Sequence, residues 1–97
     1  MDVSISSGAM RYIAQHHISC IVLDFVDIET GGSVGAVRDI GVEFEPPPNP
    51  KAYRYDRVQD VDVYIHRKLQ ITGPIRIKKQ GFWKFCSLYA DGLHVPL

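Results

Sequence analysis

The sequence predicts an α+β fold, with a mixed-sheet β-sandwich or barrel-like core of about six or seven strands and one N-terminal helix. One stretch near the N-terminus carries apolar residues at helical spacing, whereas most of the later sequence alternates apolar and polar residues, as half-buried strands do. The chain has 97 residues. Residues 1–97 are therefore expected to form a single domain, because a typical domain takes about 100–150 residues and a second core would not fit.

The first element should be a short strand within residues 2–8 that leads directly into the helix. Ser6 or Ser7 can cap the unpaired N–H groups at the start of that helix. Residues that recur every three or four positions give it one apolar stripe. They are Met10, Ile13, Ala14 and His17. The pattern predicts a helix that runs to about His17 and packs against a sheet.

A long strand follows over residues 18–28, where apolar side chains occupy both parities and indicate a central strand buried on both faces. Asp24 interrupts this pattern. It is either a functional acid with a raised pKa or a carboxylate satisfied by backbone N–H groups or an arginine near a bulge or strand end. Gly31-Gly-Ser-Val-Gly35 then suits a tight connection to a half-buried strand over residues 40–44.

The remaining strands follow a stiff loop at residues 46–50, where consecutive prolines exclude a helix interior or a central strand. Four strand-like runs are expected beyond it, at residues 53–57, 61–66, 74–79 and 82–90. With the three earlier strands they give the predicted total of six or seven.

The charges are balanced overall, with 11 basic and 11 acidic side chains, so the chain lacks the basic excess that is typical of nucleic-acid binders. No apolar run approaches the ~20 residues of a membrane helix, and the N-terminus does not resemble a signal peptide. We therefore expect a cytoplasmic protein that does not associate with membranes.

Charge is nevertheless segregated along the chain, because residues 51–97 hold nine basic and four acidic side chains. One interpretation is cross-strand ion pairing between an acidic and a basic row. These rows comprise Asp39, Glu43, Glu45, Arg76 and Lys78. The other is a nucleic-acid surface that combines cations with aromatic rings. Its residues would be Arg76, Lys78, Lys79, Trp83 and Tyr53.

Metal or catalytic chemistry finds little support in the sequence. Cys20 and Cys86 form no C-x-x-C motif, and we expect two reduced, buried thiols. A metal site could use Asp60, Asp62, His66 and His94. However, Asp62 and His66 would lie about 13 Å apart along a strand, and their alternation with valines favours a row facing solvent. No hydrolase, P-loop or zinc-protease motif is present, so we do not expect an enzyme.

Three stretches resemble the HesB-like family, which includes the A-type iron–sulfur carriers and short proteins with a cysteine pair or a selenocysteine. They are Val3-Ser-Ile-Ser-Ser-Gly-Ala-Met-Arg-Tyr-Ile13, Gly31-Gly-Ser-Val-Gly35 and Ile75-Arg-Ile-Lys-Lys-Gln-Gly-Phe-Trp-Lys-Phe-Cys-Ser-Leu-Tyr-Ala-Asp-Gly-Leu93. The resemblance implies a HesB-like domain over most of the chain. The resemblance identifies no residue of this chain as a cluster ligand, because Ser33 stands where the carriers have cysteine and the C-terminal Cys-Gly-Cys is missing.

The resulting expectation is a non-catalytic HesB-like accessory or interaction module without a cofactor. It would bind a protein partner or associate with itself, and it would have lost the iron–sulfur ligands. Two alternatives remain open. One is a small nucleic-acid-binding β module that uses the basic and aromatic C-terminal half. The other is an iron–sulfur or metal carrier with non-standard ligands, in which Cys20, Cys86 or Ser33 takes part.

Overall fold

The computed structural model describes residues 2–29, 36–81 and 86–95, and gives the backbone alone for residues 26–29 and 36–39. This part of the chain forms one α-helix and seven strands, which confirms the predicted fold class. The elements are β1 (Val3–Ile5), α1 (Ser7–Gln15), β2 (Cys20–Glu29), β3 (Ala36–Glu43), the 3₁₀ turn η1 (Pro50–Ala52), β4 (Tyr53–Val58), β5 (Val61–His66), β6 (Gln70–Gln80) and β7 (Ser87–His94). No helix within these residues is long and apolar enough to cross a membrane.

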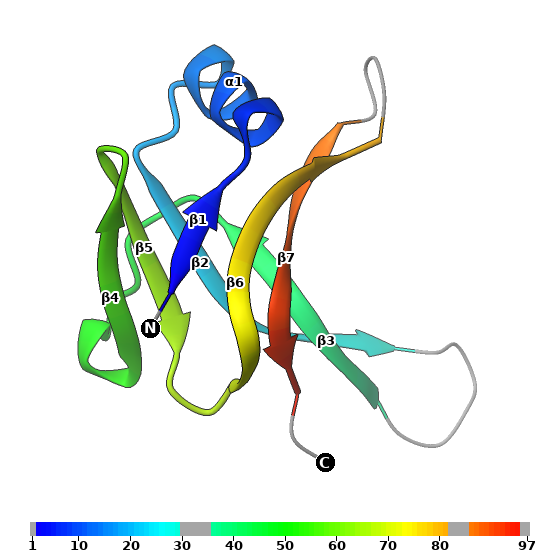
Figure 1. Cartoon of the computed structure of the whole chain (residues 1–97). Coiled ribbons are helices and arrows are strands. Elements are labelled where there is room, and N and C mark those ends of the chain that lie inside the picture. The colour runs from blue at the N-terminus through cyan, green and yellow to red at the C-terminus, as the bar shows by residue number, and fades with distance from the viewer. Residues whose placement is uncertain (1, 30–35, 82–85, 96–97) are drawn as a thin grey trace.

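The strands form two mixed sheets that face each other (Figure 1). The smaller sheet has the order β1-β6-β7, and the larger has the order β3-β2-β5-β4. Each sheet contains one parallel pair, β1 with β6 and β2 with β5, while the other neighbours are antiparallel. Strands β3 and β7 are therefore edge strands, because each of them pairs with only one other described strand.

The core lies between the sheets and under α1, and alternation along the strands determines which side chains enter it. In β5, Val61, Val63 and Ile65 are at most 3% exposed, whereas the polar and aromatic residues between them are half-buried on the opposite face. Both sheets and the helix contribute to the core cluster. Its members are Ile5, Ala9, Ile13, Ile21, Leu23, Val61, Val63, Ile65, Leu69, Ile75, Ile77 and Leu88.

Helix α1 begins where the sequence predicted and ends two residues earlier. The Ser6 hydroxyl accepts a hydrogen bond from the Ala9 N–H at 3.2 Å, which confirms the predicted cap. At the other end, His17 adopts a left-handed conformation with φ of 53°, and the Ile18 N–H donates to the Ile13 carbonyl. This reversal ends the helix after Gln15 and directs the chain into β2.

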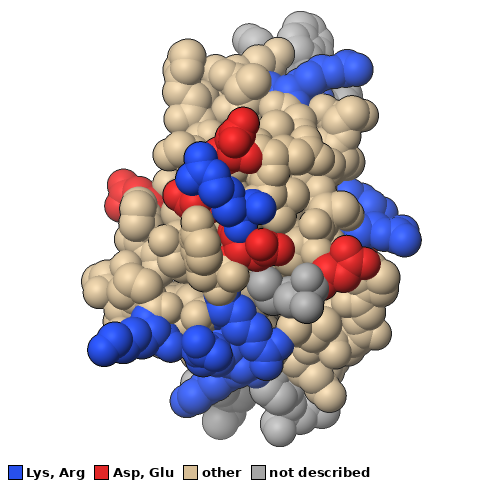
Figure 2. All heavy atoms as spheres, turned by 60° about the vertical axis from the view of Figure 1, so that its left-hand side comes forward, with Lys and Arg blue, Asp and Glu red and all other residues tan. Residues whose placement is uncertain are grey.

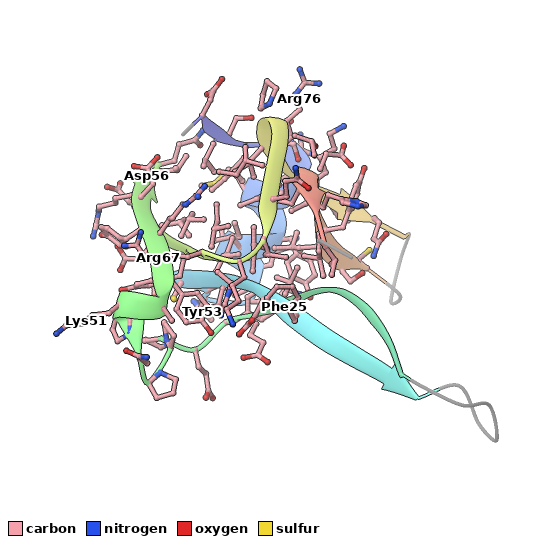
Figure 3. The ribbon with its side chains drawn as sticks, turned by 90° about the horizontal axis from the view of Figure 1, so that it is seen from below. Phe25, Lys51, Tyr53, Asp56, Arg67 and Arg76 are labelled. Atoms are coloured by element: carbon pink, nitrogen blue, oxygen red, sulfur yellow. The ribbon has the colours of Figure 1, made fainter. Side chains whose placement is uncertain are left out.

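The first half of β2, over residues 20–23, is buried on both faces, as predicted, although by different layers. Ile21 and Leu23 face the core, while Cys20 and Val22 point to the opposite face and are 3% and 2% exposed. The connection from β3 to β4 has to cross β2 and β5, and Pro47 within it is buried. Figures 1 and 3 show this connection on the side of the sheet away from β6. The predicted stiff proline loop thus covers the outer face of the larger sheet.

The predicted cross-strand pairing between the acidic and basic rows is wrong, because β3 and β6 belong to different sheets. The Asp39 side chain lies outside the described residues. The described residues form ion pairs within a hairpin instead: Lys78 with Asp91 at 3.1 Å, Arg57 with Asp62 at 3.3 Å and Arg57 with Asp60 at 4.0 Å. Figure 2 shows acidic and basic side chains mixed in the middle of the face on which β4 lies, with a separate basic group at its lower end.

Strands β6 and β7 also differ from their predicted ranges. Strand β6 begins at Gln70 rather than near residue 74, because a register shift between Ile71 and Arg76 carries it past Gly73 and Pro74. Strand β7 begins at Ser87, and residues 82–85 of the predicted strand lie outside the described part. At the bulge, Gly92 of β7 has φ of +86° and lies against the Pro74 carbonyl.

Candidate functional site

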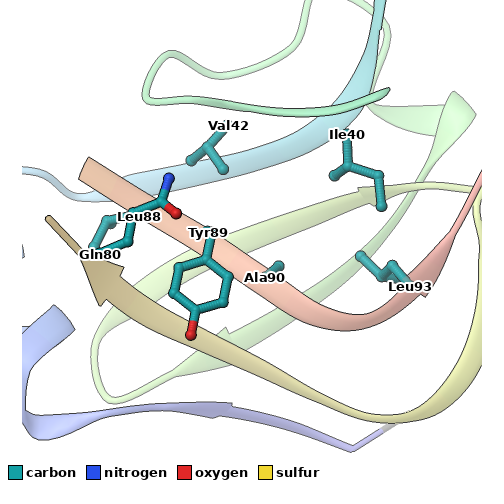
Figure 4. A pocket seen from close by; sticks show the side chains of 7 residues that line it. All are labelled: Ile40, Val42, Gln80, Leu88, Tyr89, Ala90 and Leu93. Carbon is teal, nitrogen blue, oxygen red and sulfur yellow. The ribbon is translucent and has the colours of Figure 1, made fainter. Parts of the chain in front are cut away.

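A cleft of about 490 Å³ lies between β3 and β7, the free edges of the two sheets (Figure 4). Its walls come from β3, β7 and the end of β6. The lining residues are Ile40, Val42, Gln80, Leu88, Tyr89, Ala90 and Leu93. The volume is in the range of pockets that hold small ligands or partner side chains.

The chemistry of this cleft suits binding rather than catalysis. Five of the lining side chains are aliphatic, and none carries a carboxylate, an imidazole or a thiol. Polar groups lie near one end, where the Gln80 amide donates to the Ser87 hydroxyl at 3.0 Å. A cleft with aliphatic side chains and much polar surface can hold a group that is partly apolar, but it offers no acid–base pair or nucleophile.

Asp24 lies elsewhere, on the outer face of the larger sheet, and its hydrogen-bond partners are now defined. Its carboxylate accepts from the Phe25 N–H at 2.7 Å and from the Tyr53 hydroxyl of β4. Hydrogen bonds satisfy the Asp24 carboxylate, as one interpretation predicted, and the side-chain donor is a tyrosine rather than an arginine. The predicted position at a bulge or strand end is wrong, because Asp24 lies inside β2 in continuous register with β3. The sequence carries no local signal for this pair, because it depends on how β4, β5 and β2 align.

Aromatic rings surround this hydrogen bond. The His66 ring lies 5.1 Å from both Tyr53 and Phe25 in edge-on arrangements, and Tyr55 lies 5.1 Å from Tyr64. His66 Nδ1 accepts from the Lys68 N–H at 3.1 Å, which fixes the ring. Figure 3 labels Tyr53 and Phe25, whose rings both contact His66 at the end of β5. The contacts indicate a packed structural cluster that joins three strands.

The hydrogen bond to Asp24, with smaller effects of burial and of Glu43, raises the pKa of Tyr53 to about 12. Because a raised pKa favours the protonated hydroxyl in the folded state, this stabilisation is complete below about pH 10 and is lost between about pH 10 and 12. Tyrosinate absorbance during an alkaline titration should therefore include a late step near pH 12. Tyr53→Phe should remove that step and should reduce the loss of folding stability over the same pH range. An unchanged titration curve would contradict the assignment.

The two cysteines lie in different layers. Cys20 begins β2 in the larger sheet and points away from the core, while Cys86 precedes β7 in the smaller sheet and is half-buried. Burial, and secondarily the charge of Asp62, raises the pKa of the Cys20 thiol. Thiolates are the form that binds iron or zinc, so this environment disfavours Cys20 as a ligand. Ser33 lies outside the described residues.

These environments predict unequal thiol reactivity in the native protein. An aromatic disulfide reagent should modify Cys86 first and Cys20 only as fast as the protein opens, because Cys20 is 3% exposed and its thiolate is disfavoured. Rates measured on Cys20→Ala and Cys86→Ala variants assign each phase. Rapid modification of Cys20 in the folded protein would refute the described burial.

The other residues considered for metal binding do not converge. Asp60 lies in the β4–β5 turn, Asp62 accepts from the Tyr55 hydroxyl at 2.6 Å, and His94 belongs to the other sheet. Within the described residues, no group of three His, Cys, Asp or Glu side chains is placed to hold a metal ion. The predicted alternation in β5 is confirmed, but its outer row of Asp62, Tyr64 and His66 is half-buried rather than fully exposed to solvent.

The proposed nucleic-acid residues are divided as well. Tyr53 lies in the larger sheet and donates to Asp24, whereas Arg76, Lys78 and Lys79 lie on β6 in the smaller sheet. Lys78 is paired with Asp91, and Trp83 lies outside the described residues. The structure therefore does not bring Tyr53 and the β6 cations into one aromatic and basic surface.

Comparison with known proteins gives one result. None of the curated proteins and none of the solved structures matches the chain. A family model described as the CC/Se motif containing family matches residues 1–93. Because the match covers nearly the whole chain, this protein belongs to the CC/Se motif containing family.

Proposed function

We propose that this chain is a non-catalytic accessory or interaction module of the CC/Se motif containing family, and that it binds a partner protein in the cleft between β3 and β7. The observation that carries the proposal is the position of this cleft between β3 and β7, an edge strand of each sheet. It places aliphatic side chains beside an edge strand, and a partner polypeptide can use both.

The partner we expect is an extended segment with apolar residues at alternate positions. Strand β7 hydrogen-bonds to β6 alone among the described strands, so its other edge can accept a further strand. Such a strand would direct every second side chain toward Val42, Leu88 and Leu93. Backbone pairing would supply affinity, and the size of the cleft would select the side chains.

We further propose that this chain has the HesB-like architecture without the cluster chemistry of the carriers. The order of elements supports this kinship, since a short strand, a Ser-capped helix, a long strand and a β-rich second half follow one another. The placement of Cys20 and Cys86 supports the loss of the chemistry, because Cys20 begins β2 of one sheet and Cys86 precedes β7 of the other.

Filling the cleft tests the proposed function. Ala90 is half-buried in the cleft wall, so Ala90→Leu would fill part of the cleft with three more carbon atoms and no new polar group. Ala52→Leu, in η1 and away from the cleft, is the matched control. A displayed peptide library should yield sequences with alternating apolar residues that bind the native chain and Ala52→Leu but not Ala90→Leu.

Two outcomes would overturn the proposal. One is the recovery of peptides that bind all three proteins equally, because binding would then not involve the cleft. The other is a native dimer in sedimentation that dissociates in Ala90→Leu, because a second copy would then occupy the cleft. Circular dichroism of each variant confirms that the fold is retained.

A further inference from the structure

A second pocket, of about 370 Å³, lies where α1 ends and the connection after β3 begins. Tyr12, His16 and His17 line it from the end of the helix, and Phe44 and Glu45 line it from the connection. We propose that this pocket binds an organic cation, a guanidinium or alkylammonium group. The site is separate from the cleft between β3 and β7 and does not depend on the function proposed for that cleft.

Aromatic faces provide the first reason. Tyr12 and His16 lie one helical turn apart with ring centroids 4.2 Å apart, and they form one aromatic wall. Phe44 is 38% exposed and is one of the two exposed large hydrophobic residues in the described part of the chain. A cation placed over such rings is attracted by their negative faces, by about 0.5–1 kcal/mol at exposed positions.

Charge provides the second reason. The C-terminal end of a helix carries the negative end of its dipole, and the last turn of α1 contains no basic side chain to offset it. Glu45 adds a carboxylate from the opposite wall.

The size and ligand set favour an organic group over a metal ion. Among the described residues no three His, Cys, Asp or Glu side chains are grouped to hold a metal, and Tyr12, Ile18 and Phe44 make much of the wall apolar. The planar guanidinium stacks on aromatic rings while its edge donates to a carboxylate. These features match the ring wall and Glu45.

The test compares a charged ligand with its neutral analogue. N-acetyl-argininamide, titrated at a pH of about 8 and followed by amide-resolved NMR, should give saturable shifts confined to residues 12–19 and 44–45. N-acetyl-citrullinamide, which has nearly the same shape and no charge, should not. Glu45→Gln should weaken binding about threefold, as expected for a partly exposed ion pair, while Glu43→Gln, two residues away, should not.

Phe44→Leu separates a binding role from a structural one, because it keeps an apolar side chain and removes the ring. It should weaken argininamide binding about threefold with the fold unchanged. A short peptide with one arginine distinguishes the source of the cation, since tighter binding than argininamide indicates a partner's side chain and equal binding indicates a free small molecule. Any of three results would overturn the proposal. They are equal shifts with citrullinamide, equal effects of Glu43→Gln and Glu45→Gln, and the absence of saturable shifts.

Discussion

Gly92→Ala is expected to destabilise the protein by more than about 3 kcal/mol, a large share of the roughly 5–15 kcal/mol that holds a small domain folded. The added Cβ would lie 2.3 Å from the Pro74 carbonyl oxygen and 2.9 Å from the Pro74 carbonyl carbon. The φ of +86° adds strain for any residue with a side chain. Backbone atoms of β6 cannot move aside without disturbing the pairing of β6 with β7.

Urea denaturation measures this loss, and Gly73→Ala is the matched control. Gly73 lies in β6, just before Pro74, and a Cβ added there meets no atom within 4 Å. Its replacement should change the free energy of unfolding by less than about 1 kcal/mol. Equal losses in the two variants would show that the contact between Gly92 and Pro74 is not formed in solution.

Leu23→Ala is the second large effect that we expect, with a loss of about 2–5 kcal/mol. Leu23 is 0% exposed in β2, which lies between β3 and β5, and it belongs to the cluster that both sheets and α1 share. Removal of its side chain forfeits apolar burial and leaves a cavity that the two sheets cannot fully close.

A leucine-to-alanine substitution at a half-buried position shows how much of the loss depends on burial rather than on the residue type. Leu93→Ala in β7 removes the same atoms from the wall of the cleft, where solvent already has access. It should cost less than half as much as Leu23→Ala in thermal or urea unfolding. The assignment of the core between the sheets is contradicted if Leu93→Ala proves the more destabilising of the two.

Local patterns were sufficient for much of the fold. The alternation in β5 predicted both its limits, Val61–His66, and the face that each residue takes. Ser6 was one of two predicted caps and is the one observed, because its hydroxyl reaches the Ala9 N–H. The end of α1 was misjudged by two residues, since the left-handed conformation of His17 depends on the turn into β2 rather than on apolar spacing.

Features that depend on strand order could not be predicted from local sequence. The charge rows suggested that β3 pairs with β6, whereas the order β3-β2-β5-β4 places β3 at the edge of the other sheet. The same order creates the cleft, whose walls come from Val42 and Leu88, far apart in the chain. The apolar pattern identified Asp24 as an isolated carboxylate, but it could not identify the donor, because Tyr53 is 29 residues away.

Anaerobic reconstitution with iron and sulfide tests the central claim most directly, namely that this family member works as a binding module without cluster ligands. Because Cys20 is buried on the outer face of one sheet and Cys86 directly precedes β7 of the other, we predict that the reconstituted and desalted protein has no visible absorption. A stable chromophore that Cys20→Ser or Cys86→Ser abolishes would contradict the claim.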